Sequence, residues 1–310
     1  MARKVSVVIP VFGSTATLNE LVERLERVFS TLDFEPEIIL VDDGGGAENW
    51  AEIKRISLAS RLVTGLRLSR NFGQHQAITA GFDHATGDVV VVMDCDLQDP
   101  PESIPDFLRA LDDGADIAIG TRAVEPAGLL RRFLHRTYFR MLSVLSGTEI
   151  HPGQGSFTAV TRSVATAYRR LRDVELNYLL ALHWLGFEVV EVGFPREERR
   201  AGKTTYTFWK LLRHALTGVI FQSTRLLYAA TVAGIAFSLT AMILGVLFIF
   251  QALLGTPPAG WASTVVLILL VGGANLVAVG VLGIYVARIF DQVRARPRYI
   301  VSDATNAEVN

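Results

Sequence analysis

The feature that most constrains the fold of this chain is a long stretch without formal charge. No Asp, Glu, Lys or Arg occurs between Arg225 and Arg288, in a chain of 310 residues with a mean hydropathy of +0.33. Two apolar runs, 228–254 and 262–287, each exceed the roughly 20 residues that cross a hydrocarbon core. The Gly/Pro-rich segment GTPPAGW separates them. The pattern predicts a transmembrane hairpin rather than two buried core helices, because two such runs would overfill a domain of this size.

Basic residues flank this stretch on both sides, whereas the turn between its two runs has none. The flanking cations are Lys210, Arg213, Arg225, Arg288, Arg294, Arg296 and Arg298. Because cytoplasmic flanks are enriched in Lys and Arg, we expect both termini to be cytoplasmic and the protein to be integral to the plasma (inner) membrane. The opening MARKVSVVIPVF has too short an apolar run for a signal peptide, and the single cysteine fits a reducing compartment.

Before the hairpin, short β-branched runs alternate with helical patterns. The predicted strands are 5–12, 37–43, 63–69 and 88–94, and the predicted helices are 18–32, 48–60 and 73–85. Strands that are apolar on both faces indicate an α/β domain with a parallel sheet covered by helices. We therefore predict four parts: a soluble domain over 1–205, an amphipathic segment over 206–225, the hairpin over 226–288, and a cytoplasmic tail over 289–310.

Polar or unusual residues lie at the ends of three predicted strands. They are Pro10 to Phe12, Asp42 with Asp43, and Asp94 to Asp96. In parallel sheets, ligands bind in the crevice outside the carboxyl ends of the strands. The motif DDGGG superficially suggests a dinucleotide loop, but no GxGxxG follows the first strand, and the acids would repel a pyrophosphate. A nucleotide at this edge would therefore need a cation.

The stretch VMDCDLQDPPE contains the oxygen ligands that such a cation prefers. If its first half is extended, Asp94, Asp96 and Gln98 share one side. Two carboxylates and an amide oxygen suit Mg²⁺ or Mn²⁺. A bare DxD by itself is more often a solvated turn.

The second half of this stretch has the pattern of a helix start. Asp99 is predicted as the N-cap, the two prolines as the first helical residues, and Glu102 as the partner of a capping box. Cys95 is predicted to pack in the core, because no basic neighbour in the sequence would generate a thiolate.

A series of motifs along nearly the whole chain points to one family. They are VSVVIPVF, VDDG, RNFGQHQAITAGF, GDVVVVMDCDLQDPPE, IGTR, GSF, RRAGKTTY and GIYVARIFDQVRARPRYIVSD. With these motifs the chain resembles the polyisoprenyl-phosphate glycosyltransferases, which are family-2 enzymes that include dolichyl-phosphate mannose synthases. The resemblance implies a Rossmann-like GT-A domain that transfers a sugar from a nucleotide sugar to polyprenyl phosphate. We expect the donor to be UDP-glucose and the transfer to proceed with inversion.

The same resemblance assigns roles to individual positions. It implies Mg²⁺ or Mn²⁺ bound by Asp94, Asp96 and Gln98. It implies a nucleotide-sugar site at Pro10, Phe12, Asp42, Asp43 and Asp94. It implies that Arg122 and Arg199 bind the acceptor phosphate, and we expect Arg131, Arg132 and Lys203 to contribute to that site. The residues expected to take part in catalysis are Asp94, Asp96 and Arg199.

Residues 129–145 combine apolar side chains at helical spacing with arginines at the complementary positions. This pattern is typical of a helix in the membrane interface, and its alternative is a surface helix packed on the domain's own core. A second amphipathic stretch, 206–224, leads into the hairpin.

The acceptor class bears on the mechanism. A phosphate monoester is already largely ionised at neutral pH, so direct displacement at the anomeric carbon needs no strong general base. We therefore interpret His75, His84 and His151 as structural.

Four departures from the family pattern leave alternatives open. They are Gly13-Ser14 after the first strand, Thr158 after GSF, Thr204-Thr205 before Tyr206, and Ile284 in the last apolar run. They motivate a second hypothesis, a catalytically weakened membrane scaffold that binds lipid phosphate or a partner transporter. A processive polysaccharide synthase is a third, although the chain lacks a QxxRW motif. A net charge of −1 gives no sign of nucleic-acid binding. Further partners consistent with a lipid-linked sugar product are a second copy of the chain, a lipid-sugar flippase and a downstream transferase.

Overall fold

The structure is a computed structural model that describes residues 3–13, 15–122, 153–173, 177–195, 225–254 and 260–306. The chain divides into two compact units. The described residues up to 195 and those from Pro297 onward form the first unit, and residues 225–254 and 260–296 belong to the second. The described residues from Pro297 onward therefore belong to the unit that contains the sheet, whereas the sequence predicted residues 289–310 as a separate tail.

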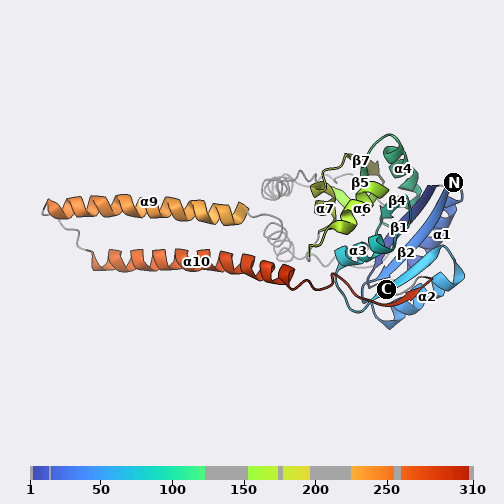
Figure 1. Cartoon of the computed structure of the whole chain (residues 1–310), viewed down its shortest axis with the longest axis horizontal. Coiled ribbons are helices and arrows are strands. Elements are labelled where there is room, and N and C mark those ends of the chain that lie inside the picture. Colours follow the sequence, from blue (N-terminus) through green and yellow to red (C-terminus); the bar gives the residue numbers. More distant parts are fainter. Residues whose placement is uncertain are drawn as a thin grey trace. The chain divides into compact units, whose positions relative to one another are not determined.

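An eight-stranded sheet, mainly parallel, forms the centre of the first unit (Figure 1). Its order is β7-β5-β6-β4-β1-β2-β3-β8. Strands β4, β1, β2 and β3 run parallel, as do β5 and β7, whereas β6 and β8 are antiparallel to their neighbours. The bounds are β1 Arg3–Val11, β2 Phe34–Asp42, β3 Val63–Leu68, β4 Val89–Val92, β5 Ile117–Arg122, β6 Gln154–Thr161, β7 Val189–Phe194 and β8 Val301–Thr305.

Helices cover both faces of this sheet, as the α/β prediction requires. Side chains of α1, α2 and α4, among them Leu21, Trp50 and Phe107, form the core on one face. Those of α3, α6 and α7, among them Phe82 and Tyr168, form the core on the other. The bounds are α1 Leu18–Phe29, α2 Ala47–Ala59, α3 Gln74–His84, η1 Pro101–Ser103, α4 Ile104–Asp112, α6 Arg162–Arg170 and α7 Tyr178–Trp184. All seven elements predicted before residue 95 are present.

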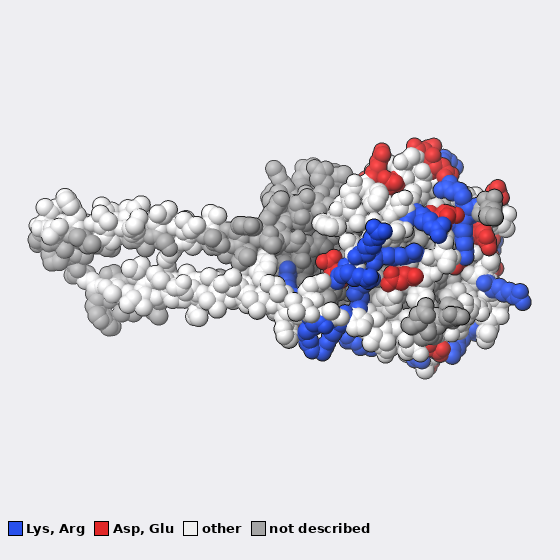
Figure 2. Space-filling model, in the orientation of Figure 1, with Lys and Arg blue, Asp and Glu red and all other residues white. Residues whose placement is uncertain are grey.

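The second unit contains two long helices, α9 Arg225–Leu253 and α10 Trp261–Val293. Figure 2 shows them without charge over most of their length. Among the described residues, one segment, Leu270–Val293, is long and apolar enough to cross a membrane, with a mean hydropathy of 2.0 and no buried residue in its most apolar part. A shorter apolar stretch, Gly234–Leu247, lies in α9.

The C-terminal strand β8 covers the edge of the sheet beside β3. Gly65 N donates to Thr305 Oγ1 at 3.0 Å, and Trp50 Nε1 donates to Asp303 Oδ2 at 2.9 Å. Asn306 Nδ2 donates to two backbone carbonyls, at 2.8 and 2.9 Å. Because an uncovered edge strand exposes unpaired backbone groups, β8 completes the sheet with residues that follow the apolar helices.

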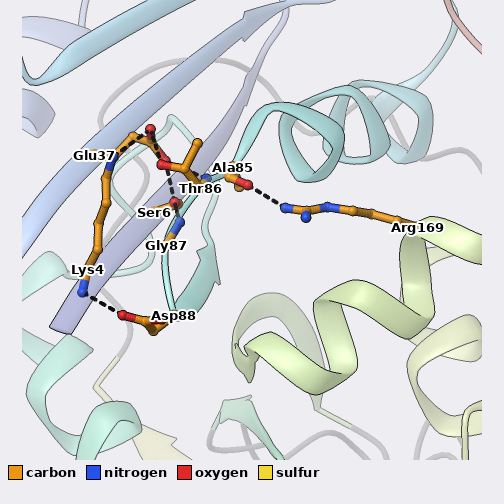
Figure 3. Close-up of polar contacts among 8 residues, drawn as sticks. All are labelled: Lys4, Ser6, Glu37, Ala85, Thr86, Gly87, Asp88 and Arg169. Carbon is orange, nitrogen blue, oxygen red and sulfur yellow. Dashed lines mark hydrogen bonds and ion pairs between the residues drawn. The ribbon is translucent and has the colours of Figure 1, made fainter.

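A polar cluster joins the amino ends of the parallel strands (Figure 3). Glu37 Oε1 accepts from Thr86 Oγ1 at 2.8 Å and from Lys4 Nζ at 3.1 Å, and Oε2 accepts from Thr86 N at 2.9 Å and from Ser6 Oγ. Gly87 N donates to Ser6 Oγ at 2.9 Å. Burial would raise the pKa of Glu37, but these hydrogen bonds outweigh it and hold that pKa below its usual value. The cluster ties β1, β2 and the α3–β4 loop together.

Candidate functional site

The acidic stretch after β4 is a turn, so the prediction of an extended segment with alternating side chains is wrong. Leu97 is in the left-handed region with φ 61° and its side chain is fully buried. Asp96 Oδ1 accepts from Gln98 N at 3.1 Å, a short-range bond that an extended chain cannot make. Asp94 and Asp96 are partly exposed, whereas Gln98 is buried. A turn therefore determines where Asp94, Asp96 and Gln98 lie.

The helix after this turn begins later than the sequence predicted. The helical turn η1 begins at Pro101, Pro100 is its N-cap, and no side chain caps it. Pro100 is extended, so it separates the buried Asp99 from the helix and the N-cap prediction is wrong. Glu102 makes an ion pair with Arg24 of α1 instead of closing a capping box, with Arg24 Nε 2.9 Å from Glu102 Oε1. Of the two prolines predicted as the first helical residues, Pro101 is helical and Pro100 is not.

Cys95 packs against the core, as predicted. Burial, and then the charges of Asp94 and Asp96, raise the pKa of its thiol to about 11. The thiol is therefore protonated at neutral pH and is a poor nucleophile. The carbonyl oxygen of Cys95 accepts from Thr17 Oγ1 at 2.6 Å, which fastens the acidic turn to the start of α1.

Asp94 is held by two side chains that the sequence analysis did not identify. Its Oδ1 accepts from Gln74 Nε2 at 2.8 Å and from Ser156 Oγ at 2.9 Å. Gln74 is the first residue of α3, and Ser156 lies in β6. Both residues lie inside motifs named in the sequence analysis, RNFGQHQ and GSF. The only feature of the sequence that could have identified them is a polar side chain close to the carboxyl edge of the predicted sheet.

Asp42 and Asp43 are both buried at the end of β2. Asp42 Oδ1 accepts from Gly45 N at 2.8 Å, and Asp42 Oδ2 lies 3.7 Å from Arg67 Nε of β3. Asp43 Oδ1 accepts from Phe72 N at 2.7 Å and its Oδ2 from Gly73 N at 2.9 Å. Burial raises the pKa of both carboxyls, and the charge of Asp42 raises that of Asp43 further.

These contacts give Asp43 a structural task that sequence reasoning missed, because it anchors the segment that leads into α3. The same segment explains a glycine. Gly44 has φ +72°, and a Cβ there would meet Asn71 N at 2.5 Å. Only glycine allows the chain after β2 to pass this close to the backbone of residues 70 and 71.

The carboxyl ends of β1, β2 and β4 lie together, because β2 and β4 are the parallel neighbours of β1. Pro10 is buried next to the end of β1, opposite Val41. Phe12 follows the strand and is 60% exposed. This edge therefore collects an exposed aromatic ring, two buried carboxylates and the partly exposed carboxylates of Asp94 and Asp96.

This donor set fits a cation shared with a bound phosphate. Among the described residues, no three His, Cys, Asp or Glu side chains form a metal-binding group. A complete protein cage is therefore not present in that part of the chain. Mg²⁺ typically takes one or two carboxylates and fills its remaining positions with substrate phosphates and water. Asp94 and Asp96, with the amide of Gln98 nearby in the sequence, match that arrangement.

Most residues predicted to bind the acceptor lie outside the described part. The backbone of Arg122 ends β5. Arg131, Arg132, Arg199 and Lys203, the stretches 129–145 and 206–224, Ser14, His151 and Thr204-Thr205 fall outside the described residues.

Three further predicted positions are described, and two of them are histidines. His75 is partly buried, which lowers its pKa, and its Nδ1 accepts from Tyr178 N at 3.4 Å. His84 Nδ1 lies 2.8 Å from Ala80 O. These contacts agree with structural roles. Thr158 is fully buried, with its Oγ1 2.6 Å from Tyr178 OH. A short hydroxyl fits there, and the larger arginine of the family pattern would have to displace Tyr178.

Comparison with known proteins shows which family the chain belongs to. Residues 6–169 match the model of glycosyl transferase family 2. An uncharacterised glycosyltransferase of Synechocystis is 33% identical, over 99% of this chain and 98% of its own. The SfII prophage-derived bactoprenol glucosyl transferase of Shigella flexneri is 32% identical, over 96% and 97%. Glucosyl-3-phosphoglycerate synthase from Mycobacterium tuberculosis matches with a TM-score of 0.49 at 18% identity, over 70% of this chain and 76% of its own. The chain belongs to glycosyl transferase family 2.

Proposed function

We propose that the protein transfers glucose from UDP-glucose to polyprenyl phosphate at the cytoplasmic face of the membrane, with inversion. The observation that carries the proposal is the match to relatives named bactoprenol glucosyl transferase. It extends over 96% of this chain and 97% of one such relative, so it includes both the sheet and the apolar helices. Bactoprenol names a polyprenyl acceptor, and glucosyl names the transferred sugar.

The nucleotide sugar binds at the carboxyl edge in this proposal. Phe12 offers an exposed ring on which a base can stack. Asp42 Oδ2 is a buried acceptor that receives no hydrogen bond from any described residue, which suits a ribose hydroxyl. Pro10 is buried near the end of β1 at the same edge. Asp43 contributes through the segment before α3, which it anchors.

Asp94, Asp96 and Gln98 are the residues proposed to hold Mg²⁺ or Mn²⁺. When bound, such a cation neutralises the charge that develops on the departing diphosphate. The chain's own contribution is to keep two carboxylates partly exposed next to the nucleotide edge. Asp94 is oriented by Gln74 and Ser156, and Asp96 by the turn that ends at Gln98.

The acceptor enters from the membrane side in this proposal. Helices α9 and α10 form the transmembrane hairpin, and Arg122, Arg131, Arg132, Arg199 and Lys203 bind the lipid phosphate. Arginine suits this task because its planar guanidinium donates two hydrogen bonds to one phosphate. An ionised phosphate oxygen attacks the anomeric carbon of glucose. The bond from that carbon to the UDP oxygen breaks, and its electron pair leaves with UDP. No proton has to be removed by a side chain.

The proposal is tested with the purified full-length protein in detergent, radiolabelled UDP-glucose, undecaprenyl phosphate and Mg²⁺. We expect a labelled lipid that is stable to alkali and released by mild acid, as a glycosyl phosphate is. Parallel reactions with UDP-N-acetylglucosamine and GDP-mannose measure donor preference, and reactions with EDTA measure cation dependence. Labelling from a different donor would overturn the glucose assignment, and an absence of labelled lipid with every donor would overturn the reaction.

A further inference from the structure

Asp94 is supported at the proposed site by side chains from two distant elements. Two donors converge on one of its oxygens, Gln74 Nε2 at 2.8 Å and Ser156 Oγ at 2.9 Å. They come from elements that precede Asp94 by 20 residues and follow it by 62. Such long-range support is not needed to close a turn, because a local hydrogen bond such as that from Gln98 N to Asp96 Oδ1 is sufficient.

The first donor stands on a rigidly packed helix. Gln74 begins α3, directly after Gly73, whose N–H is bound by Asp43. The helix lies so close to β1 that a Cβ at Gly81 would meet Val8 Cγ1 at 2.1 Å. The position of the Gln74 backbone is therefore set by the sheet, and its exposed side chain reaches Asp94 from that fixed point.

The second donor stands on the strand next to β4. The antiparallel register pairs Val92 with Thr158, and Asp94 and Ser156 lie two residues beyond this last pair. The neighbouring Phe157 is fully buried, with its ring 4.3 Å from that of Phe107 and 5.2 Å from that of Phe194. The packing of Phe157 therefore holds the strand that carries Ser156.

Two donors on one oxygen restrict rotation of the carboxylate. They also disperse negative charge on Oδ1 without neutralising the group. In metal sites, groups that orient a ligand in this way typically change cation affinity by roughly 10- to 100-fold. We propose that Gln74 and Ser156 are positioning residues, which orient Asp94 toward the cation and diphosphate of the nucleotide. This inference rests on the donor site in the proposed function.

The alternative is that both hydrogen bonds only stabilise the fold. The two roles separate because Gln74 is exposed at a helix start, where truncation leaves the core intact. A structural role predicts lower stability with unchanged cation affinity, and a positioning role predicts the reverse.

The test measures Mn²⁺ binding by the full-length protein in detergent with saturating UDP, from the electron paramagnetic resonance signal of free Mn²⁺. The variants are Gln74→Ala and Ser156→Ala. Ser156→Thr keeps the hydroxyl, and Ser163→Ala removes an exposed serine from α6 as a matched control. Urea unfolding of each variant is recorded in the same detergent.

We expect each of the variants Gln74→Ala and Ser156→Ala to weaken Mn²⁺ binding by about 10- to 100-fold. Ser156→Thr should restore affinity to near that of the wild type, and Ser163→Ala should not change it. Wild-type affinity in Gln74→Ala overturns the positioning role, whatever the folding of the serine variants. A wild-type protein that binds Mn²⁺ with UDP but makes no glucosyl lipid contradicts the proposed function alone, and the variants still decide the role of the two donors.

Discussion

The pKa values of carboxyl groups are shifted in opposite directions at the two edges of the parallel strands. At the amino edge, hydrogen bonds from Ser6, Thr86 and Lys4 outweigh burial and lower the pKa of Glu37. At the carboxyl edge, burial prevails and raises the pKa values of Asp42 and Asp43, which also repel each other. Ionised Glu37 therefore stabilises the fold, whereas ionised Asp42 and Asp43 weaken it. Carboxylates kept where they reduce stability are typical of a binding site, which supports the donor site proposed at the carboxyl edge.

The largest expected effect is on activity, from Asp96→Ala. Removing this carboxylate should lower glucosyl transfer by at least about 100-fold, because a ligand that holds the cation on the diphosphate is lost. The midpoint of urea unfolding should stay close to that of the wild type, since Asp96 is partly exposed. Asp33→Ala removes an exposed carboxylate from the α1–β2 loop and serves as the control. Transfer at the wild-type rate would contradict the metal role and favour the scaffold hypothesis.

Next in size is the effect of Glu37→Ala, which acts on the amino edge. We expect the free energy of unfolding to fall by about 2 kcal/mol, because Thr86 N, Lys4 Nζ and two hydroxyls lose a charged acceptor. Donor affinity of the folded protein should not change. Glu35→Ala, an exposed position in the same strand, is the matched control. A loss of UDP affinity in Glu37→Ala without a loss of stability would contradict the claim that the amino edge stabilises the fold and the carboxyl edge binds the donor.

A smaller expected effect is that Glu37 and Asp43, at the two edges, make the free energy of unfolding depend on pH in opposite directions. The folded-state pKa of Glu37 is lowered, so its stabilisation is complete above its unfolded pKa and is lost as pH falls through the folded value. The folded-state pKa of Asp43 is raised, so its destabilisation is complete above that value and disappears as pH falls toward 3.8.

Urea unfolding at a series of pH values, for the wild type, Glu37→Gln and Asp43→Asn, measures both effects. The stability difference between wild type and Glu37→Gln should shrink on acidification. The stability of the wild type relative to Asp43→Asn should instead rise. Two differences with the same sign of pH dependence would contradict the contrast.

The smallest effect is expected at a carboxylate on neither edge, Asp303 in β8. Its Oδ2 lies 2.8 Å from Lys54 Nζ, and both side chains are more than 40% exposed. Asp303→Asn should therefore lower the free energy of unfolding by about 0.5 kcal/mol, and Trp50 Nε1 can still donate to the amide oxygen. A larger loss would show that β8 contributes more to the sheet than an exposed ion pair does.

The sequence predicted the elements that periodicity specifies. Strands β1 to β4 and helices α1 to α3 follow from apolar runs and helical spacing, and parallel pairing then brings Phe12, Asp42 and Asp94 to one edge. The acidic turn was mispredicted because alternation assumes that the strand continues past Val92. Instead, Leu97 adopts a left-handed conformation and buries its side chain, and no propensity rule favours that for leucine.

Contacts between segments far apart in the chain also could not be predicted from the sequence. The pairing of Glu102 with Arg24, of Asp94 with Gln74 and Ser156, and of β8 with β3 each joins residues far apart in the chain. One sequence holds no signal for such partners until the sheet order is known. The sheet order in turn depends on β6 entering antiparallel between β4 and β5, which the regular alternation of strands and helices did not indicate.

The most direct test of the carboxyl-edge donor site is UDP binding by isothermal titration calorimetry, with the full-length protein in detergent, in Mg²⁺ and in EDTA. The account predicts that UDP binds at least about 10-fold more tightly with Mg²⁺ than with EDTA. It also predicts that Asp96→Ala removes this difference while Glu37→Gln keeps it. Equal UDP affinity in Mg²⁺ and EDTA, or an unchanged Mg²⁺ effect in Asp96→Ala, would contradict it.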